Sequence, residues 1–225
     1  MCGRFTLTAE VEAISERFNF DPPIRGYEKR YNIAPSQQVL AIIHDGKKNR
    51  AGYLKWGLVP PWASDPAIGH KLINARGETV AEKPSFKQAF KKRRCLILAN
   101  GFYEWKRDGK IKIPMYISLK DNRLFAFAGL WETYKTEGNP LHTCTIITTS
   151  PNELVRDVHD RMPVIIPREK EQTWLDLTME ESRVQEIIKP YPAEEMFTYQ
   201  VPSLVNSPKN EGSILLERDE PTTFF

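Results

Sequence analysis

The sequence of 225 residues has few cysteines and no long apolar run, and each shortage excludes a class of protein. The three cysteines, Cys2, Cys95 and Cys144, lie far apart, so we expect no disulfide framework, as is usual in a reducing compartment. A membrane-spanning helix needs roughly 20 consecutive apolar residues, and runs such as Cys95 to Ala99 are far shorter. The opening sequence MCGRFTLTAE has neither a basic lead nor an apolar core, so we predict no secretory signal and a cytoplasmic protein.

Motifs for metals and nucleotides are also missing from the sequence. It contains no Cys-x-x-Cys, no His-Glu-x-x-His, no Gly-rich phosphate loop and no dinucleotide fingerprint, so we predict no metal and no cofactor. The net charge of +3 is too small to indicate a polyanionic partner. Basic residues do cluster at Lys47, Lys48 and Arg50, at Lys91 to Arg94, and at Lys106, Arg107 and Lys110. Such clusters are most often solvated surfaces, although the neighbouring Trp105 suits stacking on unpaired bases.

Strand-length apolar segments outnumber helical ones. Segments rich in β-branched or aromatic residues occur at 39–43, 51–56, 95–99, 115–119, 124–130, 144–148, 164–166 and 197–201. Helices are expected after Thr8, Ser85, Ser150 and Thr178, whose side chains can cap a helix N-terminus. We therefore predict one α+β domain over residues 1–225, with a mainly antiparallel, barrel-like β core surrounded by short helices. Its core is expected over residues 2–212, and residues 213–225 form a loosely ordered tail.

Cys2 occupies the position with the most unusual chemical consequence. Removal of Met1, which is common before a small second residue, leaves Cys2 with an α-amine and a thiol on adjacent carbons. An α-amine has a pKa near ~7.8 and a lysine amine one near ~10.4, so the α-amine is about 400-fold richer in free base at neutral pH. It can form an imine with an aldehyde, and the thiol can then close a thiazolidine ring. An ordinary small residue near the terminus remains the alternative.

Glu104, His159 and Asn74 are candidates for proton transfer or positioning. Glu104 lies among aromatic residues, which can raise the pKa of a carboxyl group, although a surface glutamate in a turn fits the same pattern. His159 is expected at the end of a helix, where the dipole favours imidazolium and burial opposes it; a capping or core role is the alternative. Asn74 could orient a nucleophile and Arg76 could contact a phosphate, and a turn with a surface ion pair also fits.

Seven motifs occur in an order that resembles the SOS response-associated peptidase (SRAP) family, which shields abasic sites in DNA. The motifs are MCGRF at 1–5, YNIAP at 31–35, WGLVP at 56–60, NARGE at 74–78, GFYEW at 101–105, HDRMP at 159–163 and VPSLVN at 201–206. Each is weak alone, but their order over residues 2–212 is very specific. The resemblance implies an α+β fold and covalent capture of abasic sites in single-stranded DNA.

The resemblance also implies roles for individual residues. Cys2 would be the nucleophile that forms a thiazolidine with the opened deoxyribose, and Asn74 would hold it. Glu104 would move protons at the amine and the sugar, and His159 would act on the sugar oxygen in ring opening and reversal. Self-removal of Met1 and a weak abasic-site lyase activity are further implications.

Contacts with DNA follow from the same resemblance and from the basic and aromatic residues. They are expected from Arg4, Arg76 and Arg161 to phosphates, from Trp105 by stacking, and from Pro35 and Trp62 as a wedge against a neighbouring base pair. Two positions depart from the family pattern: Ala63 stands where a second tryptophan often follows Trp62, and Met162 where a second arginine often follows Arg161.

Two other functions remain open. Cys2 with His159 as its base would suit a thiol peptidase acting on other proteins. The basic and aromatic residues would also suit a module that binds single-stranded DNA without a covalent link. For each of these functions we expect a monomer with no membrane partner.

Overall fold

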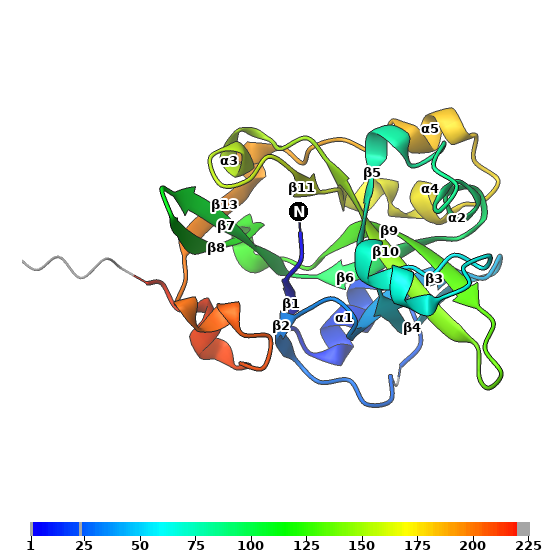
Figure 1. The fold of residues 1–225 in the computed structure, drawn as a ribbon, viewed down its shortest axis with the longest axis horizontal. Helices are drawn as coiled ribbons and strands as arrows, with labels where there is room; N and C mark the ends of the chain where they lie inside the picture. Colours follow the sequence, from blue (N-terminus) through cyan, green and yellow to red (C-terminus); the bar gives the residue numbers. More distant parts are fainter. Residues whose placement is uncertain (1, 23, 220–225) are drawn as a thin grey trace, which may run out of the picture.

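Two β-sheets, one of which closes into a barrel, organise residues 2–22 and 24–219, the part of the chain described by this computed structural model (Figure 1). The barrel strands are β3 (Gln38–His44), β4 (Asn49–Trp56), β6 (Arg94–Ala99), β9 (Phe125–Tyr134) and β10 (Leu141–Thr149). The pairs β4–β3, β3–β6, β6–β9 and β9–β10 are antiparallel, and the parallel pair β10–β4 closes the ring. The short strands β5 (Asn74–Arg76), β11 (Met162–Pro163) and β12 (Ile165–Ile166) pair with β10 or β9.

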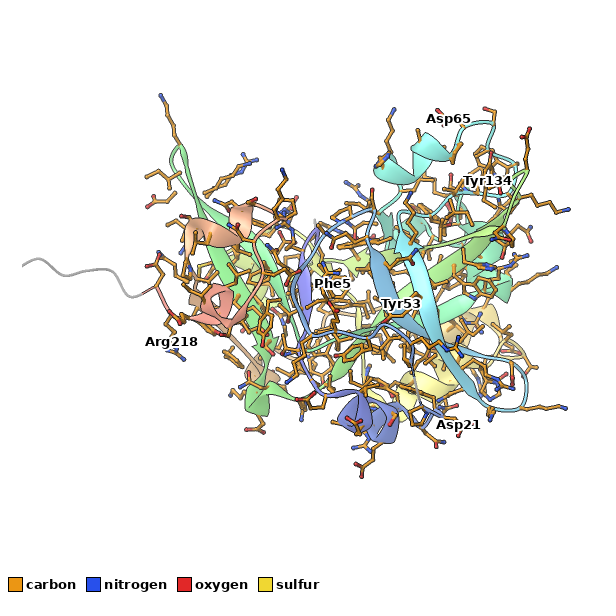
Figure 2. The ribbon with its side chains drawn as sticks, turned by 90° about the horizontal axis from the view of Figure 1, so that it is seen from below. Phe5, Asp21, Tyr53, Asp65, Tyr134 and Arg218 are labelled. Carbon is orange, nitrogen blue, oxygen red and sulfur yellow. The ribbon has the colours of Figure 1, made fainter. Side chains whose placement is uncertain are left out.

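The second sheet packs against the barrel through aromatic side chains. Its strand order is β13 (Met196–Gln200), β8 (Ile111–Leu119), β7 (Gly101–Asp108), β1 (Phe5–Leu7) and β2 (Arg30–Ile33). The ring centroid of Phe5 on β1 lies 5.2 Å from that of Trp56 and 5.6 Å from that of Phe127, both on barrel strands. Phe5 accordingly lies inside the molecule (Figure 2). Burial of these rings fixes where the N-terminal strand sits, because each large aromatic side chain removes 150–250 Å² of surface from water.

The helices are short and lie outside the sheets. They are α1 (Val11–Phe18), α2 (Lys87–Lys92), α3 (Glu153–Arg156), α4 (Glu171–Leu175) and α5 (Glu181–Gln185). Short 3₁₀ helices occur at η1 (Pro66–Lys71), η2 (Gly77–Thr79), η3 (Lys120–Asn122), η4 (Arg168–Lys170), η5 (Ala193–Glu195), η6 (Ser203–Asn206) and η7 (Ser213–Leu216). The predicted α+β class with a barrel-like β core is therefore confirmed. Within the described ranges, no helix is long and apolar enough to cross a membrane.

The predicted helix caps are wrong, although the helices lie close to where they were expected. Thr8 does not cap α1, because its hydroxyl accepts a hydrogen bond from Asn100 Nδ2 (2.9 Å) and the helix begins at Val11. Asn152 rather than Ser150 caps α3, with its Oδ1 accepting from the Val155 amide (2.9 Å). Ser85 and Thr178 precede α2 and α5 without capping them.

The C-terminal segment is packed as far as residue 219. Leu215 on η7 is fully buried beside Tyr103 and Tyr116, and the Asp219 amide donates to the Gln200 carbonyl at the end of β13 (3.0 Å). Arg218 lies 4.9 Å from the ring centroid of Tyr199 and marks this side of the molecule in Figure 2. The part of the expected tail at residues 220–225 lies outside the described residues.

Candidate active site

Strand pairing brings Cys2 to the strand that carries Glu104. β1 runs antiparallel to β7 with Phe5 opposite Phe102, and the Tyr103 amide donates to the Arg4 carbonyl (2.9 Å). Continuing this register backwards from Phe5 takes the chain alongside Glu104 and past it. Cys2 lies there, fully buried.

Asn74 holds Cys2 from the barrel side. It is the first residue of β5, which pairs parallel to β10 with Asn74 opposite Ile146. Its Nδ2 donates to the Cys2 carbonyl oxygen at 2.9 Å. Its Oδ1 is buried and accepts no hydrogen bond from any described residue. The side chain therefore fixes the backbone of Cys2 and keeps an acceptor beside it.

Glu104 is a buried carboxyl group and not a surface glutamate in a turn. It lies on β7 and is 2% exposed. Burial disfavours its charged form, and the negative charge of Asp160 adds to the effect, so its pKa rises to about 7. At neutral pH the group is thus close to half ionised, which suits a residue that accepts and returns a proton.

The thiol of Cys2 is kept protonated by its surroundings. Burial raises its pKa far above the ordinary value, and the negative charge of Glu104 raises it further. Thiols activated as thiolates occupy electropositive, partly exposed sites, and this one does not. Cys2 therefore carries its proton at neutral pH.

His159 lies just beyond α3 and has two partners on one ring nitrogen. Its backbone amide donates to the Val155 carbonyl (2.8 Å), which continues the helical turn. Its Nδ1 accepts from the Arg161 amide (3.0 Å) and lies 2.9 Å from an Asp160 carboxylate oxygen. Burial lowers the pKa of His159 and outweighs the attraction of Asp160, while the charge of Arg107 lowers it further. The shift in the His159 pKa therefore follows burial, not the direction that a helix dipole would favour.

One electrostatic neighbourhood contains the predicted chemical residues. The charge of Glu104 acts on Cys2, and Asp160 acts on both Glu104 and His159. Asp160 adjoins His159 but is not among the predicted site residues, and Arg107 is predicted only as part of a basic cluster. Nothing in the sequence signals that Arg107, on β7, acts on a histidine 52 positions later (159 − 107).

Arg4 and Trp105 contact the C-terminal segment. Arg4 donates through one guanidinium nitrogen to Asn32 Oδ1 and to the Val205 carbonyl, both at 2.7 Å. Its Cζ lies 5.7 Å from the centroid of the Trp105 ring, whose Nε1 donates to Asn206 Oδ1 (2.7 Å). Each of these two predicted DNA contacts therefore already has partners within the chain.

Arg76 and Arg161 differ in whether their side chains form ion pairs with described residues. Arg76 is exposed and forms no ion pair with a described residue. Arg161 makes a bidentate ion pair with Glu78 (2.5 and 2.9 Å) and donates to the Thr148 carbonyl (2.7 Å). The neighbouring Met162 is fully buried, so position 162 faces the core rather than solvent.

The expected wedge residues lie on two loops at the end of β4. Trp62 is 61% exposed in a turn closed by the Ala63 amide and the Pro60 carbonyl (3.0 Å). Pro35 is half-buried, and Ser36 after it contacts His70 on η1, with 3.1 Å between Oγ and Nδ1. The Ser36–His70 contact therefore ties the loop of Pro35 to the helical turn that follows Trp62.

Among the described residues, no group of three or more His, Cys, Asp or Glu could hold a metal ion.

Comparisons with known proteins identify the family of this chain. A family model described as SOS response associated peptidase (SRAP) matches residues 1–208. Abasic site processing protein YoqW is 57% identical over 222 residues, 96% of this chain and 99% of that protein, in both Bacillus subtilis and Bacillus phage SPbeta. A crystal structure from Bacteroides thetaiotaomicron superposes with a TM-score of 0.89 at 26% identity, covering 96% of this chain and 99% of the other. The chain belongs to the SRAP family.

Proposed function

We propose that this protein processes abasic sites in single-stranded DNA by covalent capture through the α-amine and thiol of Cys2. Proteins with which it shares most of its length are named for abasic site processing. The observation that carries the proposal is the buried Cys2, held by Asn74 beside a carboxyl group whose pKa is about 7. The proposal requires removal of Met1, which lies outside the described residues, because the nitrogen of Cys2 is otherwise an amide.

Glu104 performs the proton transfers of imine formation. The Cys2 amine attacks the aldehyde carbon of the opened deoxyribose, and ionised Glu104 accepts a proton from the nitrogen and returns it to the former aldehyde oxygen, giving the neutral carbinolamine. A second transfer by the same route moves the other nitrogen proton to this oxygen, which leaves as water and gives the imine. One residue can act in both directions because its pKa lies near the working pH.

The neutral thiol of Cys2 completes the capture. Its sulfur adds to the imine carbon, a carbon–sulfur bond forms, and the thiol proton passes to the imine nitrogen, closing the thiazolidine. The raised pKa of Cys2 suits this step, which uses a proton the thiol carries. It disfavours a peptidase acting in trans, which would need a thiolate.

His159 and Asn74 support the same sequence of steps. His159 exchanges a proton with the sugar ring oxygen when the ring opens, and again when the adduct reverses. Asn74 fixes the Cys2 carbonyl through Nδ2 and offers Oδ1 as an acceptor for the amine. Weak strand cleavage follows from the imine, which makes a C2′ proton acidic so that the 3′ phosphate leaves by β-elimination. The same proposal includes self-removal of Met1.

Intact-mass spectrometry after incubation with an abasic single-stranded oligonucleotide tests the proposal. We expect loss of the Met1 mass and one oligonucleotide per protein, less the water released, in a form that survives a high-salt wash. Protein that keeps Met1 should give no adduct. Equal binding of intact and abasic DNA with no mass increase would contradict covalent capture and indicate non-covalent binding.

A further inference from the structure

The three basic clusters of the sequence differ in how many of their charges are paired within the chain. In the cluster near residue 50, Lys48 pairs with Asp21, and Arg50 Nε lies 2.5 Å from Asp45. Side chains of the cluster at residues 91–94 also have partners within the chain. There Lys91 pairs with Glu181 (3.5 Å), Arg93 with Glu132 (3.2 Å), and Arg94 donates to backbone carbonyls. Partners within the chain therefore offset much of the charge of both clusters.

The third cluster lies on the hairpin formed by β7 and β8 and has no such partners. Lys106, Arg107, Lys110 and Lys112 are all exposed, and none forms an ion pair within residues 2–22 or 24–219. Asp108 is the one acidic residue between them, so this stretch has a net charge of +3 (4 − 1). The hairpin is thus an uncompensated positive arm.

The arm begins at the candidate active site. Glu104 and Lys106 are two residues apart on β7 and share a face of the sheet. Across the hairpin they lie opposite Met115 and Ile113, and Asp108 lies opposite Ile111. Ile111 is 66% exposed, and Arg107 is close enough to His159 to lower the pKa of its ring. Lys106, Ile111 and Ile113 therefore lie on the Glu104 face of the hairpin. Arg107 and Lys112 lie opposite each other on its other face, so cationic side chains flank the apolar ones from the site to the tip, roughly 17 Å from Glu104 at about 3.4 Å per residue.

We infer that the β7–β8 hairpin binds the single strand of DNA that leaves the captured sugar on one side. The inference rests on the proposed function, because that function places the sugar at Cys2. Lysine and arginine pair with successive phosphates, while Ile111 and Ile113 contact the faces of bases that duplex pairing would hide. The strand on the other side of the sugar runs away from the hairpin.

Salt-dependent binding of single-stranded DNA without a lesion tests the arm apart from the covalent chemistry. In a Cys2→Ala background, K106Q/K110Q/K112Q is compared with K47Q/K48Q/R50Q, which also removes three positive charges. For the hairpin variant we expect the slope of log affinity against log salt to fall by about 2, since each single-strand phosphate contact contributes about 0.7. The control should keep the parental slope, and equal slopes for the two variants would overturn the inference.

Two further measurements sharpen the test. Ile111→Ser should weaken binding without changing the salt slope, because it removes an apolar contact and no charge. Oligonucleotides that contain a tetrahydrofuran abasic analogue can be shortened on one side of the analogue at a time. The hairpin variant should bind more weakly than the parent when the DNA extends to one side of the analogue, and equally well when it extends to the other. An equal loss of affinity with both oligonucleotides would contradict the one-sided placement.

The hairpin and the capture chemistry fail in different ways. If the wild type forms no covalent adduct while the hairpin variant still changes the salt slope, the proposed function is wrong and the binding arm stands. If adducts form and the hairpin slope matches the control, the arm is wrong. Thermal unfolding midpoints that match the parent show that all variants are folded.

Discussion

Cys2 and the two barrel cysteines, Cys95 and Cys144, look alike by burial and differ in their neighbours. All three are fully buried, and burial raises the pKa of each thiol. All three belong to the hydrophobic core, but Cys95 and Cys144 lie inside the apolar strands β6 and β10. Cys2 has the Asn74 amide on its carbonyl and the charge of Glu104 acting on its sulfur. Burial and thiol pKa therefore do not distinguish the three cysteines; the proposed role of Cys2 rests on its position after Met1 and on its carboxyl and amide neighbours.

The largest expected effect is the loss of the adduct in Cys2→Ala. Removing the thiol prevents thiazolidine closure, so the band that resists denaturing electrophoresis should disappear. Cys144→Ala should keep the adduct and lower the free energy of unfolding by about 1 kcal/mol, as for a small cavity in a core. The contrast between the cysteines fails if Cys2→Ala keeps a stable adduct, or if folded Cys144→Ala loses it.

Glu104→Gln tests whether the carboxyl group moves protons. General acid–base catalysis contributes about 10²–10⁴-fold, so the rate of adduct formation in single-turnover assays should fall by this factor. Ionised Glu104 is the base, so the wild-type rate falls as pH drops through about 7, and this limb should become shallower in the variant. Glu132→Gln is the control, since Glu132 on barrel strand β9 is equally buried but pairs with Arg93. Equal losses in both variants would point to damaged packing.

The burial of Glu104 should also make the stability of the protein depend on pH. Because the folded pKa of Glu104 is raised to about 7, the folded state holds this proton more tightly than the unfolded chain. Protonated Glu104 then contributes up to about 3 kcal/mol to the free energy of unfolding below the unfolded pKa, and this contribution is lost as pH rises to about 7. Glu104→Gln should lose this part of the pH dependence in urea unfolding at pH 5 and pH 8. Parallel curves for wild type and variant would show that the carboxyl group is not strained in the fold.

A matched pair of asparagines gives the smallest expected effect. Asn74 Nδ2 donates to the Cys2 carbonyl (2.9 Å) and Asn49 Nδ2 to the Phe18 carbonyl (2.8 Å), and each Oδ1 is buried without a described partner. Alanine at either position should cost about 1 kcal/mol of stability. Asn74→Ala should also slow adduct formation about 5-fold, whereas Asn49→Ala should not. A similar rate for both variants would mean that Asn74 does not position Cys2.

The barrel could be predicted from the sequence because its strands are apolar in composition and strand-like in pattern. Segments such as Cys95 to Ala99 are continuous apolar runs that fall inside β6 and its neighbours. β7 was missed because its second half, from Lys106 to Asp108, is charged and exposed. The predicted cap at Thr8 is wrong because Asn100, far along the chain, donates to its hydroxyl. The one at Thr178 is wrong because this hydroxyl donates to Asp176, two residues before it.

The chemistry of the candidate site could be proposed from the sequence, but its assembly could not. Spacing places Glu104 among aromatic residues, yet its burial depends on β1 pairing beside β7. Likewise, Asn74 reaches Cys2 only because β5 pairs with β10, a contact that no local pattern contains. The charges around His159 come from Asp160 and from Arg107 on another strand. The burial and electrostatics of the candidate site thus depend on tertiary strand pairing.

The anchoring of Arg4 by the Val205 carbonyl has a consequence for biosynthesis. A ribosome makes residue 2 at the start and His159 and Val205 near the end, so Cys2 leaves the exit tunnel long before its folded surroundings exist. Under the proposed function, a nascent chain would lack the groups that move protons for Cys2. We therefore expect maturation of Cys2 to follow completion of translation, and deletion of residues 205–225 should disturb the packing of Arg4.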